Sequence, residues 1–114
     1  MRSTTPIQAV FYQSELGSEP VRIWLMALNR DQRRKIGEDI RTLQYLWPIG
    51  MPKVRKLESD LWELRTRFEA GAARVIFTIH HGKIVLLHGF VKQSTKIPGR
   101  ELTAAKRRLQ SLRS

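Results

Sequence analysis

The chain has 114 residues and carries 21 lysines and arginines against 10 aspartates and glutamates, which gives a formal net charge of +11. A small folded domain with this charge usually binds a polyanion, such as nucleic acid, an acidic protein or an anionic membrane surface; the remaining alternative is a basic protein without such a ligand. Hydrophobic residues make up 41% of the chain, so we expect it to fold rather than remain disordered, as one domain spanning residues 1–114.

Two absences from the sequence suggest a cellular setting. The chain contains no cysteine, which excludes disulfide bonds and thiolate metal ligands and is typical of a reducing compartment. No apolar run approaches the roughly 20 residues of a membrane-spanning helix, and residues 1–6 are not followed by the apolar core of a signal peptide. We therefore expect a cytoplasmic protein that does not insert into a membrane.

The first half of the chain predicts one strand and two helices. Residues 7–12 form a short β-prone run, and a turn cluster ending at Pro20 precedes a helix. Apolar residues then recur at helical spacing in two stretches, the second of which ends at Pro48. They are Val21, Trp24, Leu25 and Leu28 in the first stretch and Ile36, Ile40, Leu43 and Trp47 in the second. Because residues 29–31 join the helices tightly, we expect an αα-hairpin across one face of a sheet.

A loop and a cluster of cations follow the second helix. Residues 47–52 contain two prolines and a glycine, which indicates a loop. Lys53, Arg55 and Lys56 come directly after it. These side chains suit phosphate contacts, but their spacing fits a solvated loop edge equally well.

Three strand-like runs occupy the centre of the sequence, at residues 61–68, 73–80 and 83–92. Side chains alternate along a strand, so Arg65 and Arg67 point away from the face on which Trp62 is expected to join the core. The second and third runs are largely apolar on both faces, as buried central strands require. His81 and Gly82 separate these two runs and suit a two-residue hairpin turn.

A helix at the C-terminus completes the predicted fold. Four apolar residues recur at helical spacing after Pro98, and the other faces of the helix are strongly basic. The apolar residues are Leu102, Ala105, Leu109 and Leu112, and the cations include Arg100, Lys106 and Arg107. This stripe could dock on the sheet edge or bind a partner. The prediction is an α+β fold of order β-α-α-β-β-β-α, with a small antiparallel sheet, an N-terminal αα-hairpin on one face and a C-terminal helix.

Several kinds of catalytic site are missing from the sequence. It has no glycine-rich phosphate loop, no nucleophile elbow and no His or Cys spacing of a metal site. Its carboxylates stand next to cations, which argues against a pair working in acid–base catalysis. We therefore expect neither a cofactor nor a metal.

Arginines and lysines on the strands remain as candidates for chemistry. Such a cluster suits metal-independent cleavage of RNA, because the ribose 2′-OH supplies the nucleophile and the protein need only stabilise charge and move protons. Clustered cations repel one another, which can lower a lysine pKa towards a value useful for a general base. The candidates are Arg65, Arg67, Arg74, Lys92 and Lys96, with His88 nearby. The spacing fits equally well an exposed sheet face that the arginines keep soluble.

Four motifs in order resemble the RelE-like toxins, most closely their HigB branch, which includes phage-derived members. They are L-W-E-L-R at residues 61–65, R-V-I-F at 74–77, L-H-G-F-V-K at 87–92 and K-I-P-G-R-E at 96–101. The resemblance covers most of the chain and agrees with the predicted order of elements. It implies the toxin of a type II toxin–antitoxin pair that cleaves mRNA in the ribosomal A site without a metal. The implied partner is a helix-turn-helix antitoxin similar to HigA, in an oligomeric complex.

The resemblance also assigns roles by position. It implies that Arg65, Arg67, Arg74, Lys92 and Lys96 are catalytic, with Arg74 at the scissile phosphate. The final segment offers no tyrosine or histidine to stack on a base or move a proton, so Lys92 is the first choice of general base and His88 the second. RNA or ribosome contacts are expected from Lys53, Arg55, Lys56, Phe90, Arg100, Lys106 and Arg107.

Two other functions fit the same sequence. The missing tyrosine or histidine favours a non-catalytic module that binds RNA or a DNA-bound partner. A toxin directed at DNA gyrase is a further alternative, because folds related to the RelE-like toxins include inhibitors of that kind.

Overall fold

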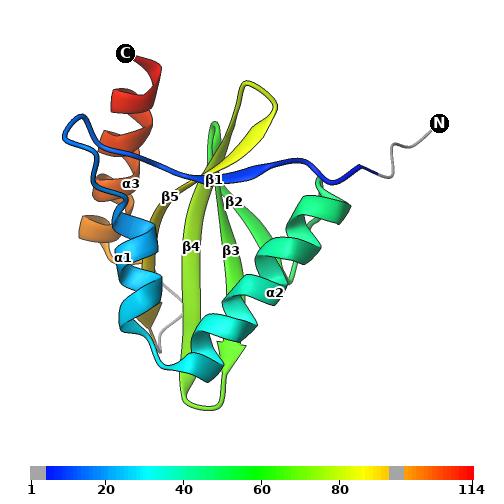
Figure 1. Ribbon diagram of the computed structural model, residues 1–114. Helices are drawn as coiled ribbons and strands as arrows, with labels where there is room; N and C mark the ends of the chain where they lie inside the picture. The colour runs from blue at the N-terminus through cyan, green and yellow to red at the C-terminus, as the bar shows by residue number, and fades with distance from the viewer. Residues whose placement is uncertain (1–4, 93–96) are drawn as a thin grey trace.

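The computed structural model describes residues 5–92 and 97–114 and shows an α+β fold, with three helices around one mixed sheet of five strands (Figure 1). The elements in chain order are β1 (Ala9–Phe11), α1 (Pro20–Ala27), α2 (Arg30–Leu46), β2 (Val54–Glu58), β3 (Leu61–Phe68), β4 (Gly71–His80), β5 (Lys83–Lys92) and α3 (Gly99–Arg113). None of the helices in these two described ranges is long and apolar enough to cross a lipid bilayer.

The sheet has the strand order β1-β5-β4-β3-β2. Strands β2 to β5 form an antiparallel meander, as the sequence predicts for β3 to β5, but β1 pairs with β5 in parallel. The prediction of a wholly antiparallel sheet is therefore wrong at this edge. Strand direction depends on how the chain returns to the sheet through α1 and α2, and the local pattern of residues 7–12 does not carry that information.

Strand β2 was missing from the predicted order, which placed these residues at the end of a loop. Its five residues, V-R-K-L-E, include three charged ones, so they show little strand propensity. They form a strand because β3 offers them backbone partners across a tight turn in which Asp60 adopts a φ of +64°. The observed order is β-α-α-β-β-β-β-α.

Helices α1 and α2 cover the same face of the sheet, but they diverge from their connection in a V (Figure 1). Helix α1 packs on β5 and β1, whereas α2 packs on β3. The expected αα-hairpin is therefore wrong in geometry, although both helices are present. Asn29 caps α2 through a reciprocal capping box with Gln32, and this cap begins the new helix in a new direction.

The core beneath α1 and α2 is apolar and partly aromatic. Trp62 stacks on Phe77 with ring centroids 6.0 Å apart, and Trp47 contacts both rings edge-on. The predicted core position of Trp62 is confirmed. On β5, Gly89 lies against the ring of Trp24, where a Cβ atom would come within 2.4 Å of a ring carbon. Only glycine lets α1 pack this closely on the strand.

Helix α3 packs on the opposite face of the sheet, against β5 and β4. Ala105 and Leu109 join a second apolar cluster with residues of the strands, among them Ile76 and Leu87. The helix therefore docks on the sheet, as one of the two open alternatives had it, but on a face over inner strands and not on the edge. The β4–β5 turn is also as predicted, since His81 and Gly82 have φ values of +50° and +75°.

Candidate functional site

The register of the central strands aligns the predicted cations in rows on the face that α3 covers in part. Arg65 on β3 lies opposite Arg74 on β4, and Arg74 lies opposite Phe90 on β5. In the next row, Arg67 lies opposite Ala72, which lies opposite Lys92. Residues directly opposite each other in a sheet share a face, so Arg65, Arg67, Arg74 and Lys92 all project from this one.

The pair of Arg65 and Arg74 brings two like charges into close contact. The backbone N–H of Arg65 donates to the carbonyl of Lys53 on the other side of the strand, 2.9 Å away. Arg65 and Arg74 are therefore a non-hydrogen-bonded pair, the kind in which facing side chains approach most closely. Like charges at such positions destabilise a sheet.

One buried carboxylate offsets part of this charge. Glu63 Oε1 accepts a hydrogen bond from Arg74 Nη1 at 2.7 Å and forms an ion pair with Arg55 Nη2 at 3.1 Å. Glu63 and Arg74 are each only 2% exposed, so the pair is shielded from water. A single negative charge thus stands among several positive ones.

Polar atoms without a partner gather at the same place. Among the described residues, five buried side-chain atoms of this cluster make no hydrogen bond: Arg55 Nε, Glu63 Oε2, Arg65 Nε, Arg74 Nε and Lys92 Nζ. Unsatisfied buried donors cost free energy and are rare in folded proteins. Four of the five belong to cations, so an anion with several acceptor oxygens would satisfy them.

Burial and mutual repulsion change the acidity of the cluster. Burial lowers the pKa of Lys92, and the charge of Arg74 lowers it further. Burial also lowers the pKa of Arg74, while Glu63 acts in the opposite direction. Guanidinium groups stay protonated in proteins, so Lys92 is the cation of this group that can give up and take back a proton.

A small hollow lies between these side chains and the loop before β2. It has a volume of about 150 Å³ and is lined by Met51, Pro52, Arg55, Glu63, Arg65 and Arg74. Since a water molecule occupies about 30 Å³ of liquid, the hollow is of the size of a phosphate group with part of its sugar. It is smaller than the pockets that usually hold whole drug-sized ligands.

His88 is on this face as well, but α3 holds both of its ring nitrogens. Nε2 lies 3.0 Å from Glu101 Oε1, and Nδ1 lies 2.8 Å from Arg108 Nη1, which also donates to the carbonyl of Leu87. A guanidinium can only donate, so Nδ1 accepts and the ring proton is on Nε2, facing Glu101. His88 therefore joins α3 to β5.

The remaining predicted contacts divide between several places. Arg55 lies in the cluster, but Lys53 pairs with Asp39 of α2 at 3.0 Å, and Lys56 stands over the ring of Trp62 at 5.9 Å. Phe90 is only 7% exposed and packs in the core under α3. The predicted contacts on α3, namely Arg100, Lys106 and Arg107, are all exposed, and Lys106 lies 3.4 Å from Glu58. Lys96 lies outside the described residues.

Glu63 belongs to the site but was not among the predicted site residues. Strand alternation placed Glu63 on the face of Arg65 and Arg67, but only the cross-strand register shows that it binds Arg74 and Arg55. The described residues contain no group of three or more His, Asp and Glu side chains that could hold a metal ion.

Comparison with known proteins places the chain in a family. Residues 23–110 match the family model described as "Phage derived protein Gp49-like (DUF891)", a range that runs from within α1 to within α3. No curated protein matches the sequence significantly. The chain therefore belongs to the Gp49-like family of phage-derived proteins, a family of RelE/HigB-type toxin-like proteins.

Proposed function

We propose that this protein is the toxin of a type II toxin–antitoxin pair, of the HigB branch, and that it cleaves mRNA in the ribosomal A site as a metal-independent endoribonuclease. The observation that carries the proposal is the set of buried, unpartnered donors on Arg55, Arg65 and Arg74 around a hollow of about 150 Å³, with the unpartnered Lys92 one row away on the same face. Family membership supports the toxin assignment.

The proposed reaction uses the nucleophile that RNA carries. The 2′-OH attacks the neighbouring phosphorus as Lys92, in its neutral form, takes the hydroxyl proton. The bond from phosphorus to the 5′ oxygen breaks, and that oxygen takes up a proton from water. The products are a 2′,3′-cyclic phosphate and a free 5′-hydroxyl.

Stabilisation of the phosphorane is assigned to two arginines. Arg65 and Arg74 face each other across β3 and β4 and present planar forks of donors, which match phosphate oxygens in two places at once. Glu63 keeps Arg74 in position through a 2.7 Å hydrogen bond. Such preorganised donors cost no reorganisation at the moment of reaction, and removing one reduces the rate by roughly 100-fold or more.

Lys92 is preferred over His88 as the general base for a structural reason. Lys92 Nζ has no partner among the described residues, and the pKa of Lys92 is lowered. His88 uses Nδ1 and Nε2 in contacts with Arg108 and Glu101 of α3. We also propose a helix-turn-helix antitoxin similar to HigA as the neutralising partner, in an oligomeric complex, on the basis of the family resemblance.

One observation favours the non-catalytic alternative. Phe90, the aromatic residue nearest the cluster in the final strand, is buried in the core and does not offer a free ring for stacking on a base. A module of this kind would bind RNA through its cations without cutting it.

Mapping mRNA 5′ ends in producing cells separates these functions. The wild-type protein and an Arg41→Gln control on the exposed side of α2 should generate cuts in phase with codons, and Arg65→Gln should not. Intact messages together with steeply salt-dependent RNA binding would replace the enzyme by the binding module. Replication arrest with intact messages would indicate a gyrase-directed toxin instead.

A further inference from the structure

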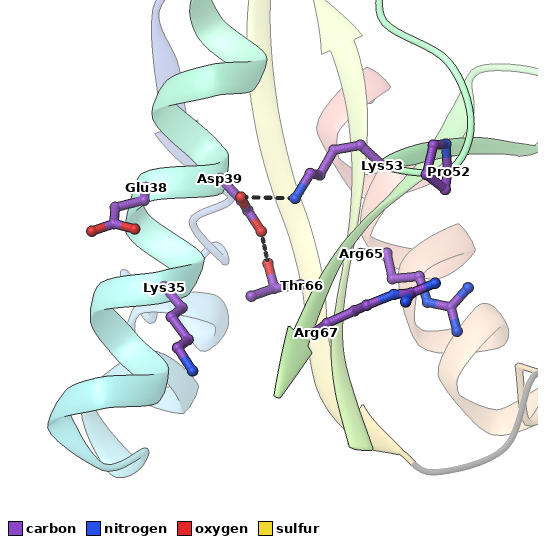
Figure 2. A pocket seen from close by; sticks show the side chains of 8 residues that line it. All are labelled: Lys35, Glu38, Asp39, Pro52, Lys53, Arg65, Thr66 and Arg67. Atoms are coloured by element: carbon purple, nitrogen blue, oxygen red, sulfur yellow. Dashed lines mark hydrogen bonds and ion pairs between the residues drawn. The ribbon is translucent and has the colours of Figure 1, made fainter. Parts of the chain in front are cut away.

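A second and larger groove adjoins the hollow at the end of β3. Its volume is about 260 Å³, and Figure 2 shows its lining: Lys35, Glu38, Asp39, Pro52, Lys53, Arg65, Thr66 and Arg67. Pro52 and Arg65 line both the groove and the 150 Å³ hollow. The two spaces therefore meet at these two residues.

The groove exists because β2 is shorter than β3. The last pairing of β2 at this end joins Val54 to Leu64, followed by the hydrogen bond from Arg65 N–H to Lys53. Beyond that point, no described strand pairs with the outer edge of β3. Backbone groups alternate in direction along a strand, so the N–H of Arg67 points to the same side as that of Arg65, into the open edge.

The charges of the groove favour an anion. Four cations line it against two carboxylates, and both carboxylates already have partners. Lys35 and Lys53 are paired with Asp31 and Asp39, so among the described residues Arg65 and Arg67 are the lining cations without an ion pair. Asp39 accepts from Lys53 Nζ at 3.0 Å and from Thr66 Oγ1 at 2.7 Å, and Glu38 pairs with Arg34. In Figure 2, Arg65 and Arg67 extend side by side from β3, away from α2.

The spacing of these two arginines suits successive phosphates of an extended strand. Arg65 and Arg67 are two residues apart on one face of β3, which is roughly 7 Å along the strand. Arg65 belongs to the cluster at the hollow, and Arg67 is exposed one row farther out, beside the free backbone edge. A polyanion bound at the hollow would meet Arg67 as it leaves.

We propose that single-stranded RNA continues from the hollow over the free end of β3, and that Arg67 holds the phosphate of the next nucleotide beside this open edge. The proposal rests on the proposed function, because it takes the hollow as the place of the scissile phosphate. RNA is the occupant we propose, and not an acidic peptide, because the proposed reaction already places an RNA phosphate in the hollow and the groove continues from it.

Binding of RNAs of two lengths tests this path. The probes are a dinucleotide, which fills only the hollow, and a hexanucleotide. In each, the sugar on the 5′ side of the phosphate meant for the hollow lacks its 2′-OH, which prevents cleavage. Arg67→Gln should weaken hexanucleotide binding several-fold and reduce its logarithmic salt slope by about 0.7, the value for one phosphate contact on a single strand. Its dinucleotide binding should equal that of the wild type. Arg65→Gln should weaken both, and the exposed control Arg41→Gln neither.

Equal loss with both probes, or no loss with either, would overturn the path. So would a polyglutamate peptide that binds as tightly as the hexanucleotide with the same dependence on Arg67. These results are independent of mRNA mapping: cuts in cells without a length effect would retain the enzyme and reject the groove. A length effect without cuts would retain the groove as an RNA site and reject the enzyme.

Discussion

Arg65 and Arg74 face each other directly across β3 and β4, and the carboxylate of Glu63 beside them binds Arg74 at 2.7 Å. Two facing guanidinium groups destabilise a sheet. Unpartnered buried donors surround this pair. A site for an anion requires such donors, whereas a purely structural role does not explain them. If this is correct, removing Lys92, the cation of the cluster whose charged atom has no partner among the described residues, should raise stability and lower activity.

The first prediction concerns Lys92→Met. Methionine has a similar length without the charge, so the variant should unfold with a free energy roughly 1 kcal/mol higher than that of the wild type, because an unsatisfied buried donor is gone. Cleavage should fall at least 100-fold if Lys92 is the general base. Urea unfolding and a cleavage assay on programmed ribosomes measure the two effects. Lys83→Met, at the exposed opposite end of β5, serves as the control and should change neither.

A Lys92→Met variant that loses stability would mean that Lys92 serves the fold. The unpartnered cations would then not indicate an anion site.

The second prediction concerns the buried pair of Glu63 and Arg74. Glu63→Ala leaves Arg74 as an uncompensated buried charge and should lower the free energy of unfolding by about 3–5 kcal/mol. Glu63→Gln and Arg74→Gln should each destabilise the protein, and the double variant should be more stable than the sum of their effects predicts. Chemical denaturation of all three variants completes the cycle. Strict additivity would show that the 2.7 Å contact contributes no coupling.

The third prediction follows from the lowered pKa of Lys92, which burial and Arg74 cause. Between this lowered value and the unfolded value of about 10.4, the unfolded chain binds a proton that the folded chain has released. The free energy of unfolding should therefore rise with pH through that window, and below it Lys92 should contribute no pH dependence. The difference between wild type and Lys92→Met isolates the effect from other groups. A difference that stays constant up to pH 10 or so would contradict the lowered pKa.

The fourth prediction separates Lys92 from His88. His88→Ala removes the acceptor of Arg108 and the partner of Glu101, so it should cost roughly 1–3 kcal/mol of stability. Cleavage per folded molecule should nevertheless remain within a few-fold of the wild type. Thermal unfolding and the ribosomal cleavage assay, run below the melting temperature of the variant, check both parts. Loss of cleavage in a fully folded His88→Ala protein would make His88 the base.

Some of this site could be predicted from the sequence, because strand alternation assigns faces without tertiary information. The pattern from Trp62 to Arg67 put the arginines opposite the core, and His81–Gly82 predicted the turn that aligns β4 with β5. The alternation could not show which residues stand opposite each other across strands. For that reason the partner of Arg74 and the burial of Phe90 were not foreseen.

The prediction that residues 53–56 belong to a loop edge also hid which cations share a face of the sheet. Once residues 54–58 form a strand, its pleat sends Arg55 to the cluster and Lys56 to the opposite face, over Trp62. In a loop, by contrast, the sequence does not show which basic side chains point to which face. The groove beside Arg67 also depends on where β2 stops, which is decided by its pairing with β3.

The most direct test of the central claim is cleavage of a programmed ribosome carrying mRNA with a single 2′-deoxy sugar at the mapped cleavage position. If the cationic cluster acts on a phosphate attacked by the neighbouring 2′-OH, the all-ribose message is cut to a fragment with a 5′-hydroxyl and the substituted message stays intact. Equal cleavage of both messages by the wild-type protein would contradict the account.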